Sequence, residues 1–151
     1  MLTADDAKSI ALFKQIAGST HIDSLLPLLQ QVSFPAGATI FREGDTDDTF
    51  FVIKKGEVEI RKALDRKNGD TKLIAILSDG EFFGEMAVFQ GQPRSTDAIA
   101  RTDLSLVKIR REELLLIFQK KPEMAHSTMR FITDVMMERL RSTTTELAAI
   151  Y

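Results

Sequence analysis

Residues 80–97 combine residue types that suit the binding of a small ligand carrying a phosphate. Arg94 follows Gly91 and Pro93, two residues that favour a chain reversal, so its guanidinium can return over the residues after Gly84. A guanidinium offers phosphate a planar fork of donors, and such charge-assisted hydrogen bonds are about twice as strong as neutral ones. The segment therefore predicts an anion site with an arginine as its cation.

The residues after Gly84 supply the rest of this predicted site. Glycine permits a positive φ or a close approach of the backbone to a ligand. Residues 85–89 are predicted to form a single helical turn, whose first N–H groups lack partners within the helix and attract anions. Glu85 would repel a phosphate, so we expect its carboxylate to accept a hydrogen bond from a neighbouring sugar hydroxyl.

The segments 83–87 and 93–95 read Phe-Gly-Glu-Met-Ala and Pro-Arg-Ser. They resemble the phosphate-binding cassette of cyclic-nucleotide-binding domains, the family of the catabolite activator and the regulatory subunit of cAMP-dependent kinase. The resemblance implies that Glu85 accepts the 2′-hydroxyl and that Arg94 holds the cyclic phosphate. It also implies that the amides of Met86 and Ala87, next to Gly84, complete the anion site.

The resemblance also suggests where the base lies. It places Ser95 near the phosphate and base, and Thr96 stands where the family usually has alanine, so its hydroxyl either adds a ligand contact or crowds the ligand. In the family a terminal helix closes over the purine, and residues 139–144 resemble the part of that helix nearest the base. Thr143 or Thr144 is then a candidate base contact, with Ile74 as an apolar one.

Three zones of the chain position this cassette. Residues 1–31 show helical spacing of apolar residues, and residues 33–109 contain short alternating segments separated by turn signals. Residues 111–150 predict a short helix and then a long one. We expect a single domain, 1–151, that is mainly β with flanking helices: a double-stranded β-helix, or jelly-roll-like β-roll, with N-terminal helices and a long C-terminal helix. The turn glycines at positions 37, 44 and 56 also match the family.

The long C-terminal helix is predicted from about residue 123 to residue 147. One apolar stripe follows helical spacing and comprises Met129, Ile132, Met136, Leu140 and Leu147. Phe131 and Val135 belong to a second stripe. A helix of about 25 residues is about 37 Å long, more than a small barrel needs, which favours a homodimer through this helix. A single wide apolar face packed within one monomer fits the pattern equally well.

Composition argues against several functional classes. The net charge is −2, no cysteine is present, and no apolar stretch approaches the ~20 residues that span a bilayer. The chain is therefore expected to be cytoplasmic, without membrane or DNA partners. His21 and His126 are the only histidines and lie in helical zones, so no metal site and no cupin-type enzyme is expected. Glu85 has no nucleophile or metal partner, so no catalytic residue is expected.

Two functional hypotheses follow. The first is a non-catalytic module that binds cAMP or cGMP and controls its C-terminal helix, with a downstream protein partner that the sequence does not name. The chain ends at Tyr151, which leaves no room for a helix-turn-helix after the long helix, so direct DNA recognition is not expected. The second is a scaffold or dimerisation module of the same fold with a vestigial pocket. Neither hypothesis requires a cofactor.

Overall fold

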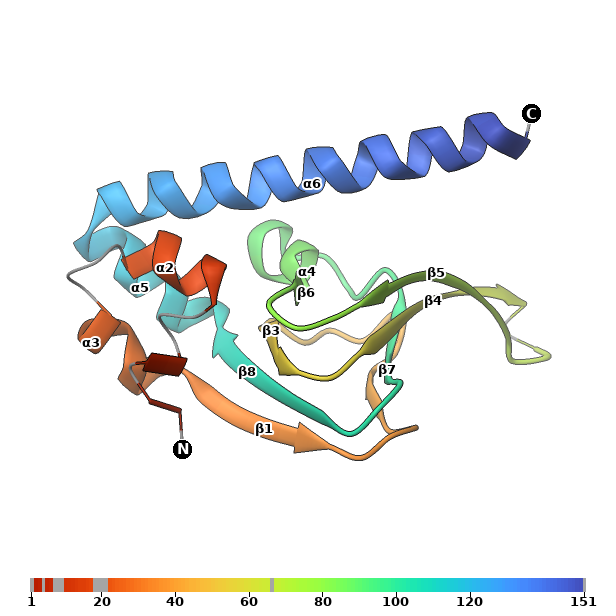
Figure 1. Ribbon diagram of the computed structural model, residues 1–151, viewed down its shortest axis with the longest axis horizontal. Helices are drawn as coiled ribbons and strands as arrows, with labels where there is room; N and C mark the ends of the chain where they lie inside the picture. The colour runs from red at the N-terminus through yellow and green to blue at the C-terminus, as the bar shows by residue number, and fades with distance from the viewer. Residues whose placement is uncertain (1, 4, 7–9, 18–21, 66, 151) are drawn as a thin grey trace.

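The computed structural model describes residues 2, 3, 5, 6, 10–17, 22–65 and 67–150 (Figure 1). Helical elements stand at both ends of the chain and strands lie between them. The helical elements are α2 (Ala11–Ala17), α3 (Ile22–Leu25), the 3-10 turn η1 (Leu26–Leu28), α4 (Glu85–Gln90), α5 (Arg111–Lys120) and α6 (Pro122–Ile150). The strands are β1 (Gln30–Phe34), β2 (Thr39–Phe41), β3 (Thr49–Lys55), β4 (Val58–Asp65), β5 (Asp70–Leu77), β6 (Phe82–Phe83), β7 (Asp97–Ala100) and β8 (Leu104–Arg110).

The strands form two four-stranded sheets, in the orders β1-β8-β3-β6 and β2-β7-β4-β5. Every strand pair is antiparallel. Helices α2, α3 and α5 gather at one end of the resulting β-roll, and α6 runs along its length past α4 and β5 (Figure 1). The predicted fold class, a β-roll with N-terminal helices and a long C-terminal helix, is therefore confirmed.

Strand β3 separates two hydrophobic cores. Its sequence, TFFVIKK, places successive side chains on opposite faces because the side-chain period of a strand is two. Phe50 and Val52 pack in the core that includes the helices, whereas Phe51 and Ile53 pack between the sheets. The two residues of β6 divide in the same way: Phe82 joins the first core and Phe83 the second. The wall between the helices and the interior of the roll is thus a continuous apolar layer.

The N-terminal boundary differs from the sequence prediction. Helical structure was expected up to residue 31, but β1 already begins at Gln30, where Gln30 pairs with Lys108 and Gln31 with Val107 of β8. Long-range pairing with β8 decides the conformation of these two glutamines, whose own preference for a strand is weak. The part of the helical prediction that covers residues 7–9 and 18–21 lies outside the described residues.

Helix α6 begins at Pro122, a residue whose fixed φ suits the first position of a helix. The two predicted apolar stripes do not correspond to one inward and one outward face, because Ile132 is buried at 5% exposure while Met129 and Leu140 of the same stripe are exposed. It faces inward together with Phe131, Val135 and Met136, which pack partly against the core. The exposed apolar residues of α6 are Met129, Met137, Leu140 and Leu147. In the described part of the chain, no helix has the length and apolar character needed to span a membrane.

Candidate functional site

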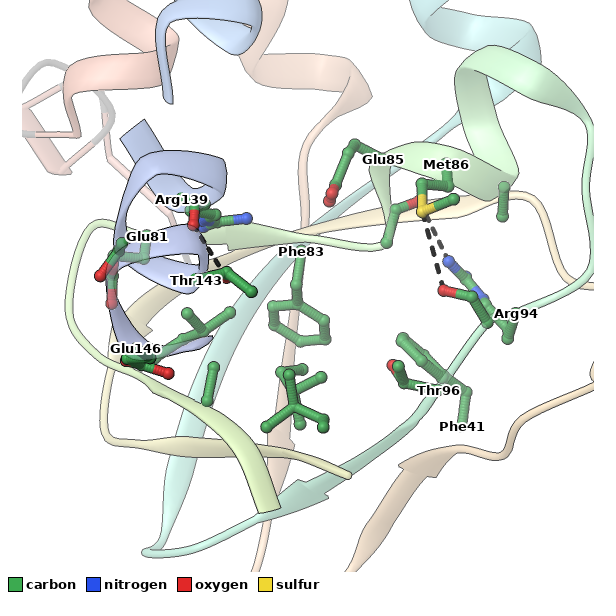
Figure 2. Close-up of a pocket in the computed structure, with 18 residues that line it drawn as sticks. Phe41, Glu81, Phe83, Glu85, Met86, Arg94, Thr96, Arg139, Thr143 and Glu146 are labelled. Carbon is green, nitrogen blue, oxygen red and sulfur yellow. Dashed lines mark hydrogen bonds between the residues drawn. The ribbon is translucent and has the colours of Figure 1, made fainter. Parts of the chain in front are cut away.

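A cavity of about 330 Å³ lies between the loop-helix-loop of residues 80–97 and helix α6. Arg94 and Thr96 stand on one side of it, Arg139, Thr143 and Glu146 on the other, and Phe83 between them (Figure 2). The cavity is lined by Phe41, Ile60, Ile74, Ala75, Leu77, Glu81, Phe83, Gly84, Glu85, Met86, Ala87, Arg94, Ser95, Thr96, Arg139, Ser142, Thr143 and Glu146. All seven residues predicted for the ligand site line this one cavity.

Helix α4 is short because left-handed glycines bound it at both ends. Gly84 has φ 83° and Gly91 has φ 65°, conformations that side-chain-bearing residues adopt only with strain. No side-chain hydrogen bond from the described residues caps its N-terminus. The first amide groups of α4, at Glu85, Met86 and Ala87, therefore point their donors toward the cavity end of the helix without a side-chain acceptor.

Arg94 is the buried cation of the site, with its side chain only 1% exposed. Its Nη1 donates to the Gly84 carbonyl at 3.1 Å, and its Nη2 donates to the Thr49 carbonyl at 2.6 Å. The same Nη2 lies 3.0 Å from a carboxylate oxygen of Asp47. The guanidinium also stacks over the Phe41 ring, 4.2 Å from its centroid, where a cation is attracted to the π face.

Asp47 balances part of this buried charge. Burial by itself raises the pKa of Asp47, but hydrogen bonds from Arg94 and Thr49, together with the charge of Arg94, outweigh that effect. The pKa of this carboxyl therefore lies below its usual value. One side-chain atom of the arginine remains unused: among the described residues, the buried Nε of Arg94 has no hydrogen-bond partner.

Gly84 is required by the arginine that packs on it. A Cβ built at position 84 would lie 2.6 Å from Nη1 of Arg94 and 3.2 Å from the Thr49 carbonyl oxygen. A side chain there would push the guanidinium off the carbonyls that hold it. Gly84 was predicted either to take a positive φ or to let the backbone approach a ligand closely. The structure shows the positive φ, and the close approach is to Arg94.

The other residues predicted for the site lie around Gly84 and Arg94. Glu85 is half-buried, Ala87 is buried, and Met86 is exposed at the mouth of the cavity. The Ser95 hydroxyl contacts the Met86 sulfur at 3.7 Å. The Ser95 carbonyl accepts a hydrogen bond from Lys62 Nζ at 2.9 Å, which fixes the loop after Arg94 to β4. The loop after Arg94 is thus held by contacts to strand β4 and to Met86 of helix α4.

Helix α6 closes the opposite side. Arg139 donates from Nη2 to the Phe82 carbonyl at 2.8 Å, and its guanidinium lies 4.8 Å from the centroid of the Phe82 ring. Ser142, Thr143 and Glu146 follow on the same face at helical spacing and line the cavity. Of the two threonines suggested as base contacts, Thr143 lines the cavity, whereas Thr144 is exposed and does not.

Several residues of the site have no distinctive signal in the sequence. Thr49 acts through its backbone carbonyl, which any residue could supply, and Asp47 lies in an acidic run that is typical of a solvated turn. Phe41 is a core-type residue by its sequence pattern and packs between the sheets. Arg139 was part of the segment compared with the base-proximal helix, but its bond to Phe82 depends on how α6 docks. Among the described residues, no cluster of three or more histidine, aspartate or glutamate side chains could hold a metal ion.

The family model of the cyclic nucleotide-binding domain matches residues 31–121. Because this match spans more than half of the chain, the chain belongs to the cyclic-nucleotide-binding domain family. It is 34% identical over 128 residues to the CRP-like cAMP-activated global transcriptional regulator of Mycobacterium tuberculosis, covering 84% of this chain and 54% of that protein. It is 29% identical over 140 residues to the cyclic AMP receptor protein of Thermus thermophilus, covering 93% of this chain and 62% of that protein.

Solved structures show the same fold. The catabolite activator protein of Thermus thermophilus superimposes with a TM-score of 0.71 and 28% identity, covering 90% of this chain and 62% of that one. A cyclic nucleotide-binding domain from Methylobacillus flagellatus superimposes with a TM-score of 0.79 over 98% of this chain and 82% of that one, at 21% identity. The chain thus spans little more than half the length of the transcriptional regulators it resembles.

Proposed function

We propose that the chain is a non-catalytic regulatory module that binds a cyclic nucleotide, cAMP or cGMP, and transmits binding through α6. The observation that carries the proposal is the cavity that has the buried Arg94 on one side and four residues of α6 on the other. A ligand that fills this cavity must contact both Arg94 and α6. Relatives named for cAMP and for cGMP both support a purine ligand: the mycobacterial regulator and a cGMP-dependent protein kinase of Drosophila melanogaster, 32% identical over 139 residues.

The proposed roles follow the chemistry of each side chain. Arg94 neutralises the cyclic phosphate, with the amides of Met86 and Ala87 as further donors. Glu85 accepts the 2′-hydroxyl, because a carboxylate has acceptors only. Ser95 and Thr96 lie beyond the phosphate toward the base. We assign the base of the nucleotide to the α6 side of the cavity, next to Thr143, with Ile74 as an apolar neighbour.

One observation favours the alternative of a scaffold with a vestigial pocket. Both Nη atoms of Arg94 are already engaged, by two carbonyls and Asp47, so a phosphate must compete with internal acceptors for them. Under this alternative the arginine is a structural pin, and no nucleotide binds at useful concentration. A direct titration separates the two functions.

The test is a calorimetric titration of the chain with cAMP and with cGMP, alongside Arg94→Ala. Loss of a buried charge partner should weaken binding by about 2–5 kcal/mol, which is tens- to thousands-fold in Kd. Arg42→Ala is the matched control, because Arg42 is an exposed arginine on the adjacent loop. Arg94→Lys keeps the charge if Arg94→Ala fails to fold. Unchanged affinity in a folded Arg94 variant would refute the site, and no heat with either nucleotide would support the scaffold.

The exposed apolar residues of α6 support a homodimer as part of this function. Leu140 is 62% exposed and Leu147 51% exposed, seven residues apart on one helix face. Leu140→Glu should convert a dimer into a monomer in sedimentation analysis. Leu64→Glu, at a residue 67% exposed on β4, should leave the dimer intact. A wild-type chain that sediments as a monomer at all concentrations would refute the dimer.

The output of such a module is proposed to pass to another protein. The chain carries a net charge of −2, which is unsuited to binding the phosphate backbone of DNA, so we assign no DNA contact to the residues given. The proposed site of action is the cytoplasm. The first experiment on output is a pull-down with and without saturating nucleotide, where a partner that appears in only one state identifies the signal.

A further inference from the structure

A second cavity, also of about 330 Å³, lies at the other end of α6, where α3, η1, α5 and the start of α6 meet. It shares no residue with the cavity beside the cassette. Five apolar side chains line it, and they come from these separate segments: Leu25, Leu28, Leu116, Ile117 and Met124.

This hollow reaches from the core to the surface. Leu25 is 0% exposed and Met124 is 5% exposed, whereas Leu116 on its rim is 51% exposed. Protein interiors are close-packed, so an apolar hollow of this size against core residues is uncommon. Its volume falls at the lower end of the range of about 300–1,000 Å³ that small-molecule sites occupy. An occupant would remove the exposed face of Leu116 from water.

The charges on the rim are divided between its ends. Lys120 and Lys121 stand at the C-terminal end of α5, and Glu113 stands on the same helix at the other end of the cavity. Seven residues of α-helix separate Glu113 from Lys120, about 10 Å along the axis. A ligand with a negative head is attracted to the lysine end and repelled from the glutamate end. The rim therefore favours one orientation of a short amphipathic anion.

We propose that this cavity binds a small amphipathic carboxylate, of the medium-chain fatty acid class. The alkyl tail lies against Leu25, Ile117 and Met124, and the carboxylate lies beside Lys120 and Lys121. Lysines are suited to this task, because a flexible ammonium group can follow the head while its stem covers apolar surface. A nucleotide fits the same place poorly, since the lining offers few polar partners for a base or a ribose.

The test is an NMR titration of the ¹⁵N-labelled chain with octanoate, kept below its micelle concentration. Saturable shifts are expected in the amides of residues 25–28 and 113–124. Hexanoate should bind about tenfold more weakly than octanoate, because each buried methylene contributes about a three- to fourfold change in Kd. The series is run with cAMP present and absent, so that binding in the cassette cavity is distinguished from binding here.

Head-group controls test the charge argument. Octanol and octylammonium have the same tail, and both should bind several-fold more weakly than octanoate. The double variant Lys120→Gln and Lys121→Gln should remove this preference, while Lys55→Gln, at an exposed lysine outside the cavity, should keep it. Leu116→Gln should weaken all three ligands with little effect on folding, because its side chain is half exposed.

Three results would overturn the proposal. The first is no saturable shift in residues 25–28 and 113–124. The second is octanol binding as tightly as octanoate, which would remove the carboxylate from the argument. The third is a set of shifts centred on residues 84–96 or on the exposed face of α6, which would place the ligand elsewhere.

Discussion

The two sides of the cassette cavity are built in different ways. On one side, residues 84–96 form a contiguous segment pinned by a buried arginine, two carbonyls and the carboxylate of Asp47. On the other side, the contacts among the described residues that hold α6 beside the cavity are a hydrogen bond from Arg139 to Phe82 and ring contacts such as Phe131 to Phe82, 6.3 Å apart. Beyond Arg139, residues 141–149 of α6 are exposed.

Under the proposed function, this difference would separate affinity from signalling. A preorganised cassette loses little freedom when a phosphate binds, so its contacts convert efficiently into affinity. The exposed C-terminal part of α6, from residue 141 onward, opens at lower cost than the part packed on the core, and elements that move in regulation are drawn from such regions. A ligand shifts the position of α6 only by as much as it prefers one position over another. The expected signal therefore arises from contacts at Thr143 and its neighbours, and the expected binding energy from Arg94.

Among these variants, Gly84→Ala is expected to have the largest effect on the difference between the two sides of the cavity. The new Cβ would meet Nη1 of Arg94 at 2.6 Å in a residue with φ 83°. We expect a loss of about 2–4 kcal/mol in the free energy of unfolding, measured by urea denaturation, from backbone strain and overlap together. The cassette side would then lose its preorganisation while α6 is untouched.

Gly80→Ala is the matched control for that variant. Gly80 has φ 85°, but no atom lies within 4 Å of its notional Cβ. It should cost only the backbone strain, about 1 kcal/mol. Equal losses in the two variants would show that contact with Arg94 contributes nothing to the cassette.

Glu85→Ala tests the ribose role and should cost about 1–3 kcal/mol of nucleotide affinity. The loss should fall on ligands that carry a free 2′-hydroxyl, because only these lose a hydrogen bond. Calorimetry with cAMP and 2′-deoxy-cAMP on wild type and variant forms a complete cycle. If the deoxy ligand loses as much affinity from the mutation as cAMP does, the assignment of Glu85 to the ribose is wrong.

Arg139→Met addresses the other side of the comparison. The variant loses the bond to the Phe82 carbonyl and the contact with the Phe82 ring, yet keeps an apolar stem of similar length. We expect the free energy needed to open α6 to fall by about 1–2 kcal/mol. This decrease would be measured as faster amide exchange in residues 133–147. The global unfolding transition should move little.

Arg141→Met is the control for this measurement. Arg141 has a side chain 73% exposed and pairs only with Glu138 on the same helix among the contacts described. Its exchange pattern should match wild type. Identical exchange in all three proteins would mean that Arg139 does not hold α6.

The smallest effect is expected from Asp47→Asn as a function of pH. The pKa of Asp47 lies below its model-peptide value of 3.8, so its contribution to stability is present above about pH 4 and is lost as pH falls through the lowered pKa. Because the side chain is 40% exposed, solvent screening limits the effect to less than about 1 kcal/mol. The difference in unfolding free energy between wild type and variant should be present at pH 5 and shrink toward pH 2.

Asp48→Asn, at the exposed neighbouring aspartate, provides the reference for that pH series. A difference from wild type that stays constant from pH 5 to pH 2 in Asp47→Asn would contradict a charge interaction with Arg94.

The sequence predicted which residues of the cassette meet at one cavity, because the cassette is local. Gly84, Glu85 and Arg94 lie within eleven residues, and turn residues between them dictate how the chain returns. The β-roll followed from alternating segments such as β4 and from turn glycines, and it was confirmed. The boundary at Gln30 was missed because long-range pairing with β8 determines it.

The far side of the cavity was less predictable. Thr143 and Ile74 were named as base contacts only through the resemblance, Ser142 was included only as part of the segment 139–144, and Glu146 was not named at all. Their positions depend on how a long helix docks on the roll, which no short spacing encodes. The burial of Ile132 also depends on how α6 docks. Helical periodicity identifies Ile132 as part of an apolar stripe, but packing decides which residues of the stripes meet the core.

Because α6 is long, a small rotation where it joins α5 would move its C-terminal end by a large distance. At 1.5 Å per residue its 29 residues form a rod of roughly 43 Å that starts at Pro122, directly after α5. A rotation of about 10° there would displace the far end by roughly 7–8 Å. The four residues of α6 that line the cassette cavity lie between positions 139 and 146, far from Pro122, whereas the cavity at Leu25 and Met124 lies close to it. A small change in packing near Pro122 would therefore be magnified at the C-terminal end of α6.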